Sequence, residues 1–275
     1  VLLEIQLPPE VEKSPLSMEL FLTAMYNSGG ESTFIARIWE GKFRAVFTLE
    51  IASNEGQIKF YLHCRKGWKN ILEAKLYGQF PEARITEVPD YVAPLPYNAE
   101  EYNLWGAEFK KSTPDALPIK TYIDYGLDKS PDKPETQVDP ISNLVEFLGQ
   151  IGQGEHIWMQ IIMRAPKSNS RQGTNWWYGF AVGGNPWKDG ARAKINDITK
   201  QAIKRAQDLI EGDGEDSKKE KQKVGSRGST LLSGGEKLQV EAIERSLTKL
   251  YFECGIRVLY IGRHDNFNGV NIGSV

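Results

Sequence analysis

The chain has 275 residues, of which 40% are hydrophobic and 25% are charged, and its formal net charge is −2. These values are typical of a globular protein with a sizeable core, and the near balance of charge argues against a protein that wraps nucleic acid with its whole surface. No apolar run of the sequence is long enough to span a bilayer. Because the chain starts inside a strand pattern and stops without an end signal, we expect further sequence on both sides.

The first 27 residues predict a strand followed by a helix. Residues 1–7 are mostly apolar and are closed by Pro8 and Pro9. Ser14 is placed as an N-cap, with Pro15 at the first helical position. The apolar stripe of this helix consists of Met18, Phe21, Leu22 and Met25.

Residues 43–88 predict a hairpin, a helix and a strand. Apolar side chains alternate in 43–51 and again in 57–64, and the turn-forming residues 53–56 separate them, which predicts a hairpin with one buried face. A helical stripe and a short strand at 84–88 follow. The stripe consists of Trp68, Ile71, Leu72 and Leu76. With the first 27 residues, this order is β-α-β-β-α-β, which is the order of a ferredoxin-like sandwich.

The second half is predicted to repeat this order of strands and helices, with additional segments. A connector rich in Pro, Tyr and Asn leads to predicted strands at 104–110 and 118–125, and a polar loop covers 128–140. A short helix then precedes a strand at 155–164. The apolar residues of this helix are Ile141, Leu144, Val145 and Leu148.

The last third predicts two long helices and a closing strand. The first helix covers 191–209, and the second runs from Ser233 to Cys254 with Gly255 as its C-cap. Between the helices, the charged stretch 211–230 is nearly free of large apolar residues and predicts a disordered loop. The closing strand is predicted at 256–262.

We therefore predict an α+β fold with two ferredoxin-like (βαββαβ) sandwich units. The first unit covers residues 1–92, a connector with one strand covers 93–117, and the second unit, decorated with insertions, covers 118–275. Cys64 and Cys254 both lie in apolar patterns. They predict buried free thiols, because two distant cysteines form neither a disulfide framework nor a zinc site.

The string Leu-Ser-Gly-Gly-Glu at 232–236 resembles the signature sequence of ABC-type ATPases. In those proteins a helix N-terminus contacts the γ-phosphate of a nucleotide held by the opposite subunit. That arrangement needs a phosphate-binding loop, and no G-x-x-x-x-G-K-[ST] occurs in this sequence. The favoured alternative is a capping box, with Ser233 as N-cap and Glu236 at the third helical position.

The sequence predicts no catalytic residue, no cofactor and no metal site. The three histidines, His63, His156 and His264, are far apart, and strand alternation turns His63 away from the apolar face that holds Cys64. The basic residues near Trp68 and those at 218–227 are interpreted as solvated surface, although a small nucleic-acid patch is the alternative.

A tryptophan-rich insertion is the candidate contact site. Residues 171–187 concentrate aromatic side chains among glycines, and such side chains suit a protein partner or a membrane interface. A loop that packs on its own sheet is an equally open alternative. The residues singled out are Trp176, Trp177, Tyr178, Phe180 and Trp187.

The order of these segments resembles a conserved domain of candidate-phyla (Patescibacteria-type) bacteria, a family without assigned catalytic residues. The strings that carry the resemblance begin with VLLEIQLPPEVEKSPLSMELFL and FTLEIASNEGQIKFYLHCRKGWKNILEAKLYGQFPEARITEVPDYV, and continue through LWGAEFKKSTPDALPIKTYIDYGLDKSP, DPISNLVEFLGQIGQGEHIWMQIIMRA and EAIERSLTKLYFECGIRVLYIG. Members of that family typically carry the domain after a transmembrane segment. Some continue into an ATPase similar to those of type IV secretion and conjugation.

The resemblance implies a membrane-proximal domain without catalysis. We expect a structural or interaction domain of a membrane-associated protein, on the cytoplasmic face of a bacterial membrane. Such a domain would serve a type IV secretion-like assembly, contact protein partners including copies of itself, and reach the membrane through a segment outside this chain. The alternatives are a nucleotide-dependent ATPase component, based on the string at 232–236, and a ferredoxin-like module that binds nucleic acid.

Overall fold

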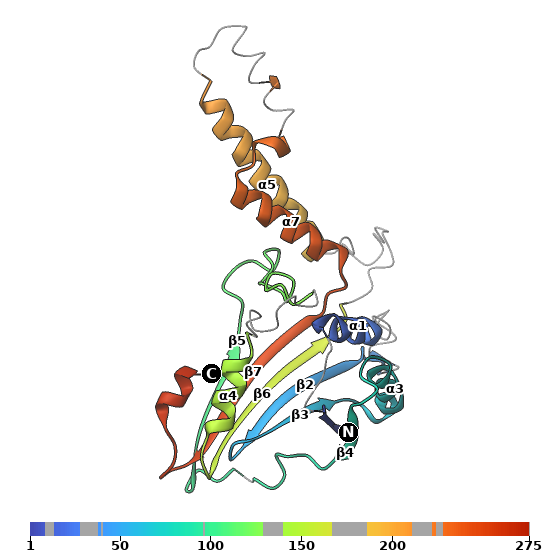
Figure 1. The fold of residues 1–275 in the computed structure, drawn as a ribbon, viewed down its shortest axis with the longest axis vertical. Helices are drawn as coiled ribbons and strands as arrows, with labels where there is room; N and C mark the ends of the chain where they lie inside the picture. Colours follow the sequence, from blue (N-terminus) through green and yellow to red (C-terminus); the bar gives the residue numbers. More distant parts are fainter. Residues whose placement is uncertain are drawn as a thin grey trace. The chain divides into compact units, whose positions relative to one another are not determined.

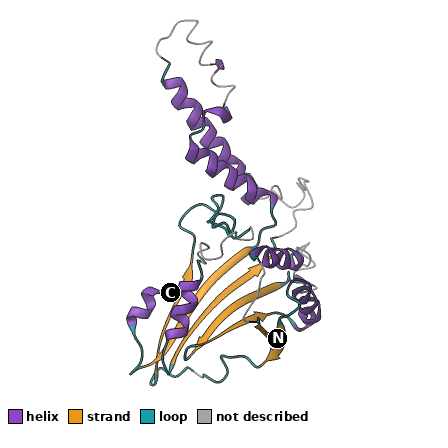
Figure 2. Ribbon diagram, in the orientation of Figure 1, coloured by secondary structure: helices purple, strands orange, loops and turns teal. Residues whose placement is uncertain are grey.

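The fold is a mixed α+β fold built on one antiparallel sheet of seven strands in the order β4-β1-β3-β2-β6-β7-β5 (Figure 1). It is seen in a computed structural model that describes residues 1–8, 14–27, 38–39, 41–95, 97–128, 140–166, 186–210, 222–223 and 228–274. The predicted loop at 211–230 and the tryptophan-rich stretch 171–187 lie mostly outside these described residues. Figure 2 shows the helices, strands and loops of the described residues.

The chain divides into two compact units that interleave along the sequence. The sheet unit comprises Val1–Lys110, Lys120–Ser168 and Tyr251–Val275, and the helical unit comprises Lys111–Ile119 and Asn169–Leu250. The predicted domains at 1–92 and 118–275 are instead consecutive. The difference arises because the chain leaves the sheet after one strand, forms most of the helical unit, and returns to pair with that same strand.

The elements of the first 92 residues occur in the predicted β-α-β-β-α-β order. Their bounds are β1 (Leu2–Gln6), α1 (Pro15–Met25), β2 (Val46–Asn54), β3 (Gln57–His63), α3 (Lys69–Gln79) and β4 (Arg84–Val88), with the short η1 (Lys66–Trp68) before α3. Ser14 caps α1 as predicted, because its Oγ accepts a hydrogen bond of 3.1 Å from the Leu16 N–H. The hairpin turn is left-handed at Glu55 (φ 53°) and Gly56 (φ 82°), which suits a tight connection.

The remaining elements complete the sheet and form the helical unit. In the sheet unit they are β5 (Tyr102–Phe109), α4 (Ser142–Gln150), β6 (Glu155–Arg164), β7 (Glu253–Arg263) and η5 (Gly269–Ser274). In the helical unit, α5 (Pro186–Asp208) and α7 (Gly234–Thr248) lie side by side, and η4 (Gly228–Leu231) precedes α7 (Figure 1). Among the described helices, none combines the length and the hydropathy that a membrane span requires.

The predicted strand at 118–125 is wrong, because this stretch forms consecutive turns. The N–H and Oγ1 of Thr121 both donate to Asp124 Oδ2, at 2.7 and 3.0 Å. The Asp124 and Gly126 N–H groups bond back to the carbonyls of Thr121 and Ile123. Local side-chain hydrogen bonds of this kind compete with strand pairing, and here they outweigh the apolar alternation.

The predicted end of the last helix is also wrong. The helix stops at Thr248, where the cap residue Lys249 bonds to the Ser246 carbonyl, and residues 253–255 already belong to β7. Glu253 pairs with Arg164 at the far end of β6, so the sheet requires an extended chain here despite the helical periodicity. Cys254 is consequently exposed on the strand rather than buried as predicted, whereas Cys64 is buried.

One face of the sheet, here called the helix face, is covered by α1, α3 and α4 (Figure 1). Two apolar clusters fill it, one under α1 and α3 and one under α4. The first is built from Leu3, Phe21, Met25, Phe47, Leu62, Cys64, Leu72, Leu76 and Met163, and the second from Leu148, Ile151, Ile157, Val258 and Tyr260.

The opposite face, here called the crossing face, is also partly buried, which corrects the prediction of a single buried face. Because β4 and β5 are the two edges of the sheet, the chain between them, residues 89–101, must cross its whole width. Tyr91 and Leu95 of this crossing segment pack on a cluster of sheet residues. The cluster consists of Leu2, Ala52, Tyr61, Trp158 and Ile261.

Candidate functional site

Of the predicted contact residues, only Trp187 lies within the described part of the chain. It stands in the first turn of α5, is half-buried, and its Nε1 donates a 3.1 Å hydrogen bond to the Asp115 carbonyl. Trp187 therefore contributes to packing inside the helical unit. Trp176, Trp177, Tyr178 and Phe180 lie outside the described residues, and their role as a contact site stays a prediction.

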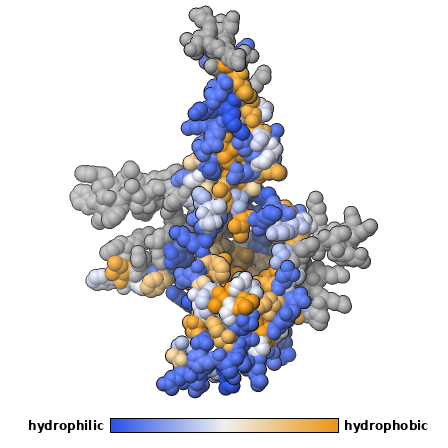
Figure 3. Space-filling model, turned by 90° about the vertical axis from the view of Figure 1, so that its left-hand side faces the viewer, coloured by the Kyte–Doolittle hydropathy of each residue, from blue (hydrophilic) through white to orange (hydrophobic). Residues whose placement is uncertain are grey.

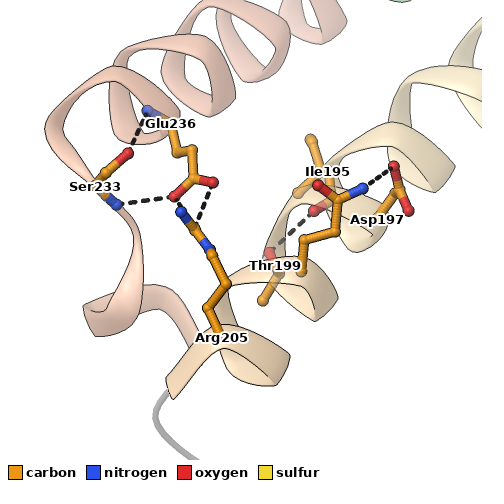
Figure 4. A network of polar contacts seen from close by, with 7 residues as sticks. Ile195, Asp197, Thr199, Arg205, Ser233 and Glu236 are labelled. Carbon is orange, nitrogen blue, oxygen red and sulfur yellow. Dashed lines mark hydrogen bonds and ion pairs between the residues drawn. The ribbon is translucent and has the colours of Figure 1, made fainter. Parts of the chain in front are cut away.

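The string at 232–236 forms the predicted capping box of α7 (Figure 4). Ser233 Oγ accepts from the Glu236 N–H at 3.3 Å, and Glu236 Oε2 accepts from the Ser233 N–H at 2.9 Å. The Arg205 guanidinium reaches across from α5 and donates to both Glu236 oxygens, at 2.6 and 2.7 Å. The hydrogen bonds from Arg205 and Ser233 hold the pKa of Glu236 below its usual value. The glutamate thus caps one helix and ties it to the other.

The three histidines are not brought together. His63 and His264 are exposed, and His156 is half-buried on β6. Within the described ranges, no group of three or more His, Cys, Asp and Glu side chains is arranged to hold a metal ion.

A cleft lies between the crossing face and the crossing segment. Its volume is about 490 Å3. Seven strand residues and the first part of the crossing segment form its walls. The polar wall residues are Glu4, Asn54, Gln57, Lys59, Asp90 and His156, and the others are Tyr61, Val88, Pro89, Tyr91, Pro94 and Leu95.

Two residues that line the cleft, Glu4 and Tyr61, belong to a row of mostly polar side chains that runs across all seven strands. Strand register places one residue of each strand in this row. From the β4 edge to the β5 edge, the row reads Thr86, Glu4, Tyr61, Glu50, Gln160, Arg257 and Glu108. Neighbouring strands bring such side chains within about 5 Å of each other, which suits a continuous hydrogen-bond network.

The centre of the row fastens the crossing segment to the sheet. The Tyr91 hydroxyl donates a 2.5 Å hydrogen bond to the buried carboxylate of Glu50, and Gln160 Nε2 donates to both of these groups. Arg257 Nε donates to Gln160 Oε1 at 2.5 Å and thereby orients the amide. Burial and the adjacent Glu50 raise the pKa of Tyr91, so this phenol stays a donor.

Aromatic rings add to this attachment. The rings of Tyr91 and Tyr61 are stacked with centroids 5.0 Å apart, and the edge of Tyr91 meets Trp158 at 5.2 Å. Such pairs contribute about 0.5–1.5 kcal/mol beyond the area that they bury. Tyr91 is thus held by both a polar and an apolar contact.

A charged pair forms the wall next to β1. Glu4 is nearly buried, accepts from Gln6 Nε2 at 2.6 Å, and pairs with Lys59 Nζ at 3.1 Å. Burial alone raises the pKa of a carboxyl group, but the hydrogen bonds from Gln6 and Lys59 and the charge of Lys59 outweigh it. The pKa of Glu4 therefore lies below its usual value.

Asn54 and His156 oppose each other on β2 and β6 at the other end of the cleft. Asn54 Oδ1 lies 2.9 Å from both His156 Nδ1 and Trp158 Nε1. An indole N–H can only donate, so the asparagine atom that faces it must be the oxygen, and His156 must donate from Nδ1 as well. The acceptor of the neutral imidazole is then Nε2. Burial lowers the pKa of His156 against an opposing effect of Glu55, which favours this neutral form.

The two edges of the sheet differ in length and polarity. β4 has five residues and carries Arg84 and Glu87, the latter paired with Lys69 at 2.5 Å. β5 has eight residues, YNLWGAEF, with a single charge and no proline. Short, charged edges resist further pairing, whereas long apolar edges invite it. Figure 3, drawn from the side on which β5 lies, shows apolar surface interrupting the hydrophilic surface of the sheet unit.

The backbone of β5 alternates between paired and open groups. The Arg263 N–H bonds to Gly154 on the β6 side, so its opposite residue, Tyr102, points away from β7. By alternation, the N–H and C=O groups of Leu104, Gly106 and Glu108 also point away from β7. Within the described residues, no backbone hydrogen bond reaches these three residues.

Sequence reasoning missed the cleft and the role of Tyr91. The connector was recognised as rich in Tyr and Pro, but nothing local indicated which face of the sheet it covers. The sequence did hold one usable signal. Glu50, Tyr61 and Gln160 lie in the middle of their strands, at positions that the apolar alternation assigns to the solvent-facing side. Comparison of the chain with family models, with curated protein sequences and with solved structures gives no match in any of the three.

Proposed function

We propose that this chain is an interaction domain without catalysis, which joins copies of itself within a membrane-associated assembly. The observation that carries the proposal is the open edge of β5, with its eight residues and its outward backbone groups at Leu104, Gly106 and Glu108. Adding a strand to such an edge supplies main-chain hydrogen bonds that need little side-chain specificity.

A second copy fits this edge in an antiparallel pairing centred on Gly106. A twofold arrangement is the commonest in homo-oligomers. In this register Leu104 of each copy opposes Glu108 of the other, so that the two carboxylates do not face each other. On the helix face, Trp105 meets Ala107 and Phe109 meets Asn103, which pairs large side chains with small or polar ones. Leu104 and Phe109 are about half exposed and would be covered.

The resemblance to the candidate-phyla domain supports the setting of this proposal. It motivates a membrane-associated parent protein, with the chain on the cytoplasmic face and a type IV secretion-like machine as the assembly. We also propose that residues 1–92 form a ferredoxin-like unit, since the strand order β4-β1-β3-β2 and two helices on one face agree with that description. Residues 118–275 do not support a second unit of this kind, because their described elements include only the strands β6 and β7 and part of the stretch belongs to the helical unit.

Light scattering on the purified chain, with a proline variant, tests the interaction. Glu108→Pro removes one outward N–H without touching the pairing to β7, because proline is tolerated at the open side of an edge strand. Glu108→Ala is the matched control, since it removes the same charge and keeps the N–H. We expect a concentration-dependent dimer for the chain and for Glu108→Ala, and a dissociation constant at least about tenfold higher for Glu108→Pro. A strict monomer, or equal dimerisation of the two variants, would contradict the proposal.

A further inference from the structure

The most exposed large apolar side chain among the described residues is a tryptophan. Trp39 is 88% exposed, and both its neighbour Ile38 and the nearby Phe43 are more than half exposed. The four peptide steps from Trp39 to Phe43 limit the distance between their Cα atoms to about 15 Å. One short segment before β2 therefore presents three large apolar side chains to solvent.

Cationic side chains accompany this segment. The Arg65 guanidinium lies 5.9 Å from the centre of the Phe43 ring, so the chain that follows β3 lies next to the segment. Lys66 comes directly after Arg65, Lys42 comes directly before Phe43, and all three cations are exposed. Glu87, whose charge interacts with Lys66, is already paired with a lysine of α3 at 2.5 Å. This part of the sheet unit thus combines apolar side chains with positive charge, although the whole chain has a net charge of −2.

This combination fits the surface of an anionic membrane. Tryptophan is enriched at the headgroup level of bilayers, where its ring is buried and its N–H stays near water. Each cation that lies near an anionic lipid surface strengthens binding about fivefold. A nucleic acid would also attract the cations, but Ile38 has no ring on which a base could stack. A lipid surface, unlike a small ligand, does not require that the side chains converge on one point.

We propose that this chain itself contacts anionic lipid headgroups through a surface here called the lipid patch. The patch consists of Ile38, Trp39, Lys42, Phe43, Arg65 and Lys66. The apolar side chains enter the headgroup region, and the cations hold lipid phosphates beside them. The cation–π contact between Arg65 and Phe43 orders the boundary between the two kinds of side chain. The patch shares no residue with β5, so it does not depend on the self-association proposed above.

Co-sedimentation of the full chain with lipid vesicles tests this contact. One set of vesicles consists of phosphatidylcholine alone, and the other also contains phosphatidylglycerol, so that the two sets differ in surface charge. We expect binding to the anionic vesicles to be at least about tenfold stronger than binding to the neutral ones. Binding should also weaken as salt is added, because salt screens the cations. Equal binding to both sets, or no binding to the anionic vesicles, would overturn the proposal.

A tryptophan variant tests whether the apolar part of the patch enters the lipid. Trp39→Ala should weaken binding to the anionic vesicles at least about fivefold, because it removes the largest inserted side chain. Leu238→Ala is the matched control, since it shortens a largely exposed apolar side chain on α7, outside the patch. Equal binding of the two variants would contradict the proposal. Because both side chains are exposed, we expect both variants to fold, which circular dichroism checks.

A charge variant tests the cationic part. The double variant Arg65→Gln and Lys66→Gln should weaken binding to the anionic vesicles at least about tenfold. Lys200→Gln with Lys204→Gln removes the same charge from an exposed face of α5 and should weaken binding less than about threefold. An equal effect of the two double variants would mean that net charge, and not the patch, attracts the lipid. Binding of single-stranded DNA that Trp39→Ala abolishes, without binding to vesicles, would assign the patch to nucleic acid and overturn the proposal.

Discussion

The two faces of the sheet are buried by different means. The helix face is covered by three helices over apolar clusters, with Phe47 and Leu62 almost inaccessible. The crossing face is covered only in part by the one irregular segment that runs across it, and this segment is fastened through the polar residues Glu50 and Gln160. Apolar burial is non-directional and tolerant, whereas a buried polar network depends on each partner. The first face thus gives the sheet its stability, and the second gives it a shaped surface.

The largest effect is expected from truncating the helix face. Phe47→Ala removes a buried ring that meets Trp68 edge to face at 5.5 Å, and it should lower the free energy of unfolding by about 3–5 kcal/mol. Chemical denaturation followed by circular dichroism measures this loss. Phe47→Leu is the control and should lose much less, because it keeps most of the volume. A loss below about 1 kcal/mol for the alanine variant would mean that this face is not the main core.

A smaller loss is expected on the crossing face. Tyr91→Phe keeps the ring and removes the hydroxyl, so Glu50 loses a donor. The free energy of unfolding should fall by about 1–3 kcal/mol. Hydrogen exchange should also quicken in residues 89–95. A double-mutant cycle with Glu50→Gln isolates the pair, and a coupling energy near zero would show that the Tyr91–Glu50 contact does not hold the segment.

A single neutral hydrogen bond on the helix face should matter still less. Ser53 is fully buried, and its Oγ donates at 2.5 Å to the Leu148 carbonyl in the last turn of α4. Ser53→Ala should cost about 1 kcal/mol, measured by the same denaturation. Ser53→Cys keeps a weak donor, so its stability should lie between that of Ser53→Ala and that of the unaltered chain. Equal stability of Ser53→Ala and the unaltered chain would place α4 outside the cooperative core.

The smallest effect appears only in acid. The pKa of Glu4 is lowered in the folded chain, so its ionised form contributes stability above about pH 4.5, its ordinary pKa, and this contribution is lost as the pH falls through the folded pKa. Glu4→Gln should therefore flatten the acid limb of the stability curve. Lys59→Met should shift that limb to higher pH, because the carboxylate loses its partner. An acid limb that is identical in all three chains would refute this assignment.

Local signals predicted most elements and little of their assembly. The hairpin at residues 46–63, the strand Glu155–Arg164 and the capping box at Ser233 follow from alternation, turn residues and cap spacing, all of which act within a few residues. The pairing of β2 with β6 joins residues about 110 positions apart, and no local pattern encodes it. The extended conformation of Cys254 likewise follows from the pairing of β7 with β6, which no local pattern predicts.

The candidate site was unpredicted for the same reason. Tyr91, Glu50 and His156 come from three distant segments, and each has an ordinary neighbourhood in the sequence. Only the path of the crossing segment brings Tyr91 to Glu50 and into the same cleft as His156. The tryptophan-rich stretch could be singled out from the sequence because its signal is local composition.

The return of the chain to β6 bears on how this protein can change. Arg164 and Glu253 are paired neighbours in the sheet, and the whole stretch between them begins and ends at that one pair. Sequence can be lengthened, shortened or exchanged there while the strands keep their register, as at sites that accept inserted domains. The sheet and the stretch that holds α5 and α7 are therefore free to diversify at different rates, and only Lys111–Ile119 adds to the helical unit from another part of the chain.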